Sequence, residues 1–138
     1  LIFGYNEYGL EIAKNVTHKY DAITIFNLNE STDTLKSDIP FDIESFDLSD
    51  DWDDIKRDYD LEQSKIFCAL SDEAQNIFLT ISLRSEFKNI TIIALAKNNE
   101  DANKLTMAGA SKVIPIVETS ANIITDMLKK PIITDILH

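Results

Sequence analysis

Short apolar runs and helix-like segments alternate along the whole of this 138-residue chain. Six runs have the length and the β-branched or aromatic content of strands: residues 1–4, 22–27, 43–47, 65–70, 90–96 and 112–116. Six segments between and after them have the composition of helices: 7–20, 30–37, 50–59, 72–87, 99–109 and 118–130. Strands that are apolar on both faces and joined by helices form parallel sheets with helices on both sides. The sequence therefore predicts an α/β fold, a Rossmann-like doubly wound sheet of about six strands.

The charge of the chain is −11 and is concentrated in its first half. Residues 42–62 alone carry ten carboxylates, which predict a solvated acidic helix with acidic flanks. Such a surface repels phosphate backbones, so we expect no nucleic-acid partner. A calcium loop starting at Asp51 fails because Ile55 and Lys56 occupy the positions of an oxygen ligand and the glycine. The single cysteine, Cys68, lies in an apolar run and is expected to be buried.

The first strand-like run leads into a glycine turn, Gly4-Tyr5-Asn6-Glu7-Tyr8-Gly9. In a dinucleotide-binding turn the first glycine permits the tight turn, the second admits the pyrophosphate, and the third lets the helix pack on the strand. Here the second glycine is replaced by Asn6. Asparagine tolerates the left-handed backbone, but its side chain occupies space that the pyrophosphate would fill. Glu7 lies in the same turn and opposes an anion.

A second departure concerns the acidic residue that binds ribose hydroxyls at the end of the following strand. That place is taken by Asn27, which lacks the charged, bidentate acceptor of a carboxylate. Together, Asn6 and Asn27 predict weak or absent NAD binding.

The helix-like segment 72–87 and the C-terminal tail carry more apolar surface than one sheet face requires. One stripe contains Ala74, Ile77, Phe78 and Ile81, and another contains Leu79, Leu83 and Phe87. One stripe can cover the sheet, and the other either sinks between neighbouring elements or meets a second copy of the chain. The interface candidates are Ile77, Leu79, Leu83, Phe87, Ile123, Ile124, Met127, Leu128 and Ile132.

Taken together, these motifs make the chain resemble the RCK (regulator of K⁺ conductance) N-terminal domain, also called the TrkA-N or KTN domain. The resemblance rests on the glycine turn, on FDLSDDWDDI, on CALSDEAQN leading into IFLTISLR, and on NKLTMAGASKVIP. In the last of these, Gly109 is expected to form a left-handed helix C-cap. The resemblance implies a Rossmann lobe over residues 1–117 and, over 118–138, a crossover helix with the start of a segment leading to a following lobe. Because the chain opens within a strand, we also expect a preceding segment.

What the resemblance implies is regulation and not catalysis. It implies a cytoplasmic gating and assembly domain of an inner-membrane potassium channel or transporter, forming a homodimer or a higher ring, and a fused channel pore is preferred. The ligand is left open, because Asn6, Asn27 and Leu95 weaken the case for NAD or an adenine nucleotide. Ala69, Leu95 and Lys97 stand where channel-type members place calcium-binding carboxylates, so that calcium site is expected to be absent. Residues carried over to the ligand cleft are Gly4, Tyr5, Asn6, Glu7, Gly9, Asn27, Asp47, Ser71, Asp72 and Lys97.

Two alternatives remain. One is a stand-alone Trk-type potassium-uptake subunit or a Kef-type efflux regulator that binds NAD(H) or an adenine nucleotide. The other is a fragment of an NAD-dependent oxidoreductase, which would need a second domain with acid–base residues. No nucleophile or metal-ligand arrangement favours catalysis, so the sequence predicts that the chain is not an enzyme.

Overall fold

The computed structural model describes residues 1–17, 19, 22–28, 41–49 and 52–116. Their elements follow in the order β1 (Ile2–Phe3), α1 (Glu7–Val16), β2 (Thr24–Leu28), β3 (Asp42–Phe46), α2 (Asp53–Asp58), a 3₁₀ turn (Leu61–Gln63), β4 (Lys65–Cys68), α3 (Glu73–Glu86), β5 (Thr91–Ala96), α4 (Asn99–Ala108) and β6 (Lys112–Pro115). All six expected strands are present, as are four of the expected helices. The helices expected over 30–37 and 118–130 lie outside the described residues.

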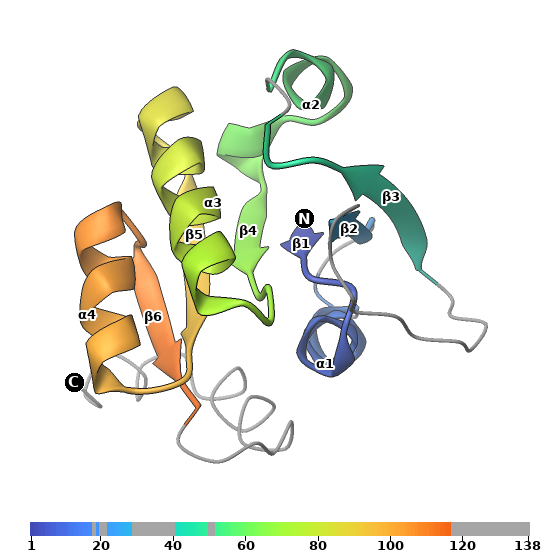
Figure 1. The fold of residues 1–138 in the computed structure, drawn as a ribbon. Helices are drawn as coiled ribbons and strands as arrows, with labels where there is room; N and C mark the ends of the chain where they lie inside the picture. The colour runs from blue at the N-terminus through green and yellow to red at the C-terminus, as the bar shows by residue number, and fades with distance from the viewer. Residues whose placement is uncertain (18, 20–21, 29–40, 50–51, 117–138) are drawn as a thin grey trace.

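The six strands form one parallel sheet in the order β3-β2-β1-β4-β5-β6. The chain therefore builds outward from β1 to one edge, returns to the centre, and builds outward from β4 to the other edge (Figure 1). This is the Rossmann order, and it places a single switch point between β1 and β4. The fold predicted from the alternating pattern is confirmed.

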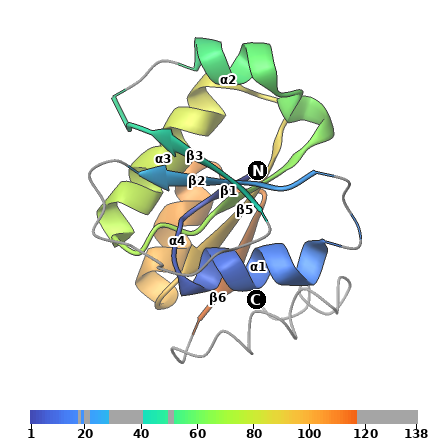
Figure 2. The same cartoon turned by 90° about the vertical axis from the view of Figure 1, so that its right-hand side faces the viewer.

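Successive residues of the central strands face opposite sides of the sheet, and both sides are buried. On β1, Ile2 packs into the layer beneath α1, whereas Phe3 packs into the layer that includes Leu79 and Leu83 of α3. Strand β5 alternates in the same way from Ile92 to Ala96. Figure 1 shows α3 and α4 side by side on one face, and Figure 2 shows α1 along the other. The unbroken apolar character of these strands follows from burial on both faces.

The structure also decides which stripe of α3 meets the sheet. Leu79 and Leu83 have no exposed surface, so they belong to the core of the chain and the interface role predicted for them is wrong. Ile77 and Phe87 are partly buried and pack against the same core. The outward stripe contains Phe78 and Ile81, which are 49% and 48% exposed. The remaining interface candidates, Ile123, Ile124, Met127, Leu128 and Ile132, lie outside the described residues.

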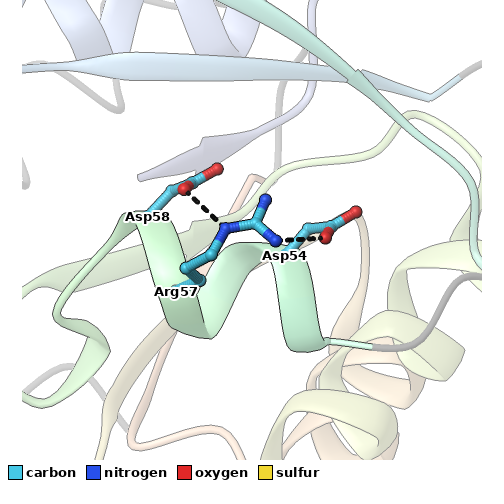
Figure 3. A network of polar contacts seen from close by, with 3 residues as sticks. All are labelled: Asp54, Arg57 and Asp58. Atoms are coloured by element: carbon cyan, nitrogen blue, oxygen red, sulfur yellow. Dashed lines mark hydrogen bonds and ion pairs between the residues drawn. The ribbon is translucent and has the colours of Figure 1, made fainter.

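Helix α2 is the acidic helix expected from the sequence, and it has no buried residue. Its Arg57 lies between two carboxylates, with Nη1 3.1 Å from Asp54 Oδ1 and Nε 3.3 Å from Asp58 Oδ1 (Figure 3). Asp58, and then Asp54, raise the pKa of the Arg57 guanidinium. Because all three side chains are exposed, these ion pairs add little stability. Helix α2 is held to the sheet by apolar packing, as Trp52, one residue before it, makes edge contacts with Phe3 and Phe87.

Candidate functional site

The carboxyl ends of β1 and β4 flank the switch point, where Rossmann-type sheets bind their ligands. The turn after β1 is built on two glycines whose roles are those predicted. Gly4 has φ +149°, and a Cβ there would lie 2.4 Å from the carbonyl oxygen of Ala69. A Cβ on Gly9 would lie 1.8 Å from the carbonyl oxygen of Gly4. Larger residues at either position would push α1 away from β1 or β1 away from β4.

Asn6 does not adopt the left-handed backbone considered for it. Its φ of −150° and ψ of −176° are extended, which is the usual conformation of a helix N-cap. Its Oδ1 accepts from the Gly9 N–H at 2.9 Å, and its Nδ2 donates to the carbonyl oxygen of Ala69 at 2.7 Å. The side chain is 8% exposed. These two hydrogen bonds fix Asn6 across the switch point, between the turn after β1 and the end of β4.

Asn27 lies in β2, directly before the last residue of that strand. Its Oδ1 is buried and has no hydrogen-bond partner within the described residues. Asn27 pairs in register with Ser45 of β3, so the carboxyl ends of the two strands are level. Asn27 Oδ1 is therefore an acceptor at the carboxyl end of β2, where dinucleotide-binding domains hold the acidic residue that binds the ribose.

The loops after β4 and β5 meet next to the turn. Asp72 caps α3 by accepting from the Gln75 N–H, and Asn98 caps α4 by accepting from the Asp101 N–H. Lys97 is exposed, and its Nζ donates to the Ser71 carbonyl oxygen. The candidates Ser71 and Lys97 are thereby brought together.

Asn76 joins the ends of β4 and β5, a role that was not predicted from the sequence. This side chain is 2% exposed. Its Oδ1 accepts from the Leu70 N–H at 3.1 Å, and its Nδ2 lies 3.2 Å from the carbonyl oxygens of both Cys68 and Leu95. An amide on the buried face of a helix, in line with Leu79 and Leu83, is the signal that could have indicated it, because such a group needs partners.

Asp47 lies beyond the end of β3, toward the acidic edge of the sheet. It accepts from the N–H and the hydroxyl of Ser49 at 2.9 and 2.8 Å, and these bonds lower the pKa of its carboxyl. With Phe46, Trp52 and other residues it lines a cavity of about 330 Å³. Glu7, at the start of α1, is exposed.

Ala69 and Leu95, two of the positions compared with calcium-binding members, are buried apolar side chains, with Leu95 6% exposed. The Cys68 thiol is fully buried, and this burial raises its pKa to about 12. Among the described helices, none has both the length and the hydropathy that crossing a membrane requires.

A six-stranded Rossmann sheet with a glycine turn at its switch point defines a nucleotide-type α/β domain. The TrkA-N domain model matches residues 1–116, and the chain belongs to this family. Among solved structures it is similar to the crystal structure of the GsuK RCK domain, with a TM-score of 0.68 and 25% identity over 94% of this chain and 28% of that chain. The chain is thus an RCK-type domain related to the regulatory domain of the GsuK channel.

Two further similar structures are ligand complexes. The GsuK channel bound to NAD has a TM-score of 0.66 and 23% identity, covering 98% of this chain and 24% of that chain. GsuK bound to ADP has a TM-score of 0.63 and 24% identity, covering 94% and 33%. The chain therefore spans about a quarter to a third of these relatives. No curated protein matches the sequence.

Proposed function

We propose that this chain is the regulatory domain of a potassium channel or transporter, acting by self-association and by coupling the shape of the assembly to ion flow. Membership of the TrkA-N family is the observation that carries the proposal. The relation to the GsuK channel favours a fused channel pore, which would place the domain on the cytoplasmic side of an inner membrane. A ligand can shift such an assembly only by binding one of its states more tightly than the other.

The outward face of α3 and α4 supports self-association. Phe78 and Ile81 are half exposed on α3, and Met107 is 88% exposed on the neighbouring helix α4. These are the large hydrophobic side chains most exposed among the described residues. Large exposed apolar side chains on two adjacent helices are typical of a surface that meets another protein. We assign that surface to a second copy of the chain, together with the predicted crossover segment 118–138.

Light scattering of two variants tests the assembly. Replacing Phe78 and Ile81 with glutamine keeps helix propensity and removes the exposed apolar stripe. We expect the double variant to be monomeric at a concentration where the parent chain is dimeric or larger. Lys14→Gln on α1, on the other face of the sheet, should leave the mass unchanged. A strictly monomeric parent chain at high concentration would contradict the proposal.

The role in ion transport is tested on the full-length gene product. Its potassium conductance in membranes should depend on residues 1–138, so that deleting them changes the open probability or the transport rate. The opposing interpretation, an oxidoreductase fragment, predicts hydride transfer with nicotinamide cofactors. Proteins of this regulatory family are not typically catalytic, and turnover in that assay would overturn the regulatory function.

The stand-alone alternative rests on the same family match over residues 1–116. The resemblance to TrkA-N domains also fits a Trk-type or Kef-type regulatory subunit that binds a separate membrane protein. Two transmembrane segments with a potassium-selectivity filter in the gene upstream of Leu1 would establish the fused channel. Their absence, with binding to a separate membrane subunit, would establish the alternative.

A further inference from the structure

We propose that the Asn6 side chain is a built-in clasp that takes the diphosphate position of the crevice and keeps dinucleotides and adenine nucleotides out. The inference rests on the proposed function, since it concerns ligand access to the same regulatory domain. It deepens that function by assigning one side chain as the determinant of nucleotide exclusion.

Both ends of the Asn6 carboxamide are engaged. Oδ1 accepts the Gly9 N–H at 2.9 Å, a group at the helix N-terminus that could otherwise turn toward an anion. Nδ2 donates to the Ala69 carbonyl oxygen at 2.7 Å, on the other side of the switch point. Asn6 is 8% exposed, so it is packed between the turn after β1 and the end of β4.

A bound dinucleotide normally lies across this crevice and bridges the two halves of the sheet. In this chain Asn6 makes that bridge itself, from the turn after β1 to the end of β4. Asn76 continues it, since it holds Leu70 and the carbonyl oxygens of Cys68 and Leu95. The two halves are therefore joined without a ligand.

The rest of the turn keeps the form that a nucleotide site needs. Gly4 retains a positive φ of +149°, and Gly9 remains in close contact with the Gly4 carbonyl. The N-terminus of α1 is intact behind them, with ten residues of helix supplying its dipole. Since the second glycine position is where this turn departs from the motif, removing the Asn6 side chain should reopen the site.

The test measures NAD and ADP binding to the 138-residue chain by calorimetry. Asn6→Gly removes the clasp, and glycine is well tolerated at a helix N-cap. We expect it to bind NAD and ADP at least ~10-fold more tightly than the parent chain, a ratio that corresponds to about 1.4 kcal/mol. Asn6→Ser keeps a capping oxygen on a side chain too short to reach Ala69, and it should show the same direction of change.

Two further comparisons complete the design. Asn98 caps α4 in the same way, since its Oδ1 accepts from the Asp101 N–H at 2.7 Å. Removing this cap with Asn98→Gly should not strengthen the binding of NAD or ADP. Asn6→Gly is also compared with its parent in an Asn27→Asp background, where the ribose acceptor is restored. Unfolding curves check that each variant is folded.

The inference is overturned if folded Asn6→Gly and Asn6→Ser bind no better than their parents in either background. It is equally overturned if the parent chain binds NAD as tightly as Asn6→Gly, or if Asn98→Gly gains as much. The proposed function is judged separately, by the dimer and by the dependence of potassium flow on the domain. If both are intact while the binding test fails, only the role of Asn6 is refuted.

Discussion

Replacing Asn76 with alanine should lower the free energy of unfolding by about 3 kcal/mol. The substitution removes the acceptor of the Leu70 N–H and the donor shared by the Cys68 and Leu95 carbonyl oxygens. A buried backbone group left without its partner costs about 1–3 kcal/mol. The N–H has one bond to lose, whereas each carbonyl has a second lone pair, so the N–H should account for most of the loss. The higher helix propensity of alanine returns about 0.5 kcal/mol.

Urea unfolding followed by fluorescence measures this change. The chain has one tryptophan, and Trp52 packs against Phe3 and Phe87, so its emission should report loss of the core. The midpoint should fall while the slope stays unchanged, since the surface exposed on unfolding is nearly the same. Asn15→Ala is the matched control, because the bonds from its Nδ2 go to Glu11 within α1 and its loss should cost under ~1 kcal/mol. Equal small effects of the two substitutions would refute the reasoning.

Asn76→Asp separates the acceptor from the donor. The introduced carboxyl keeps an oxygen for the Leu70 N–H but turns another toward two carbonyl oxygens. Burial and those oxygens should raise its pKa in the folded state above the unfolded value. The destabilisation should then be full at neutral pH and decrease as pH falls through the folded-state pKa. A destabilisation that does not vary with pH would contradict this account.

Three other outcomes are expected. Gly109→Ala should lower the free energy of unfolding, measured in urea, by about 2 kcal/mol, because Gly109 has φ +116° and a Cβ would lie 2.5 Å from Arg84 Cγ. A neutral effect would show that this turn relaxes around the new side chain. Cys68 should resist a thiol reagent at pH 8 until the chain unfolds, since burial raises the pKa of its thiol to about 12; rapid native labelling would contradict this. Ser49→Ala should raise the pKa of Asp47 in an NMR titration: the backbone N–H of residue 49, the larger cause of the lowered pKa, still donates, but the hydroxyl bond is lost. The stability contributed by this carboxylate is lost as pH falls through its folded pKa, and an unchanged titration would exclude the hydroxyl as a cause.

The alternation of strand-like and helical segments was sufficient to predict the sheet, because burial on both faces leaves a plain apolar signal. Gly4, Gly9 and Gly109 were also predictable, since each occupies a position where a side chain meets backbone or needs a positive φ. For α3, periodicity showed two apolar stripes but not their direction. Phe78 and Leu79 are neighbours in the sequence, and only the packed sheet decides which of them faces inward.

The candidate site was predicted less completely than the fold. Residue type suggested a left-handed Asn6, but capping of α1 and the hydrogen bond to Ala69 favour an extended backbone. The role of Asn76 depends on strands that are adjacent in space and distant in sequence, which no local pattern contains. Likewise, the contact between Lys97 and Ser71 follows from the meeting of two loops and not from the lysine itself.

The acidic edge strand β3 lies at one edge of the sheet, and β5 and β6, next to the outward apolar face of α3 and α4, lie toward the other. The carboxylates gather on β3 and α2, whereas residues 73–115, which carry α3 and α4, hold four acidic and five basic side chains and are close to neutral. Two copies that approach through β3 repel each other, and two that approach through α3 and α4 do not. The distribution of charge thus favours one orientation of two approaching copies. A higher salt concentration should weaken this preference, because it screens the repulsion between the β3 edges.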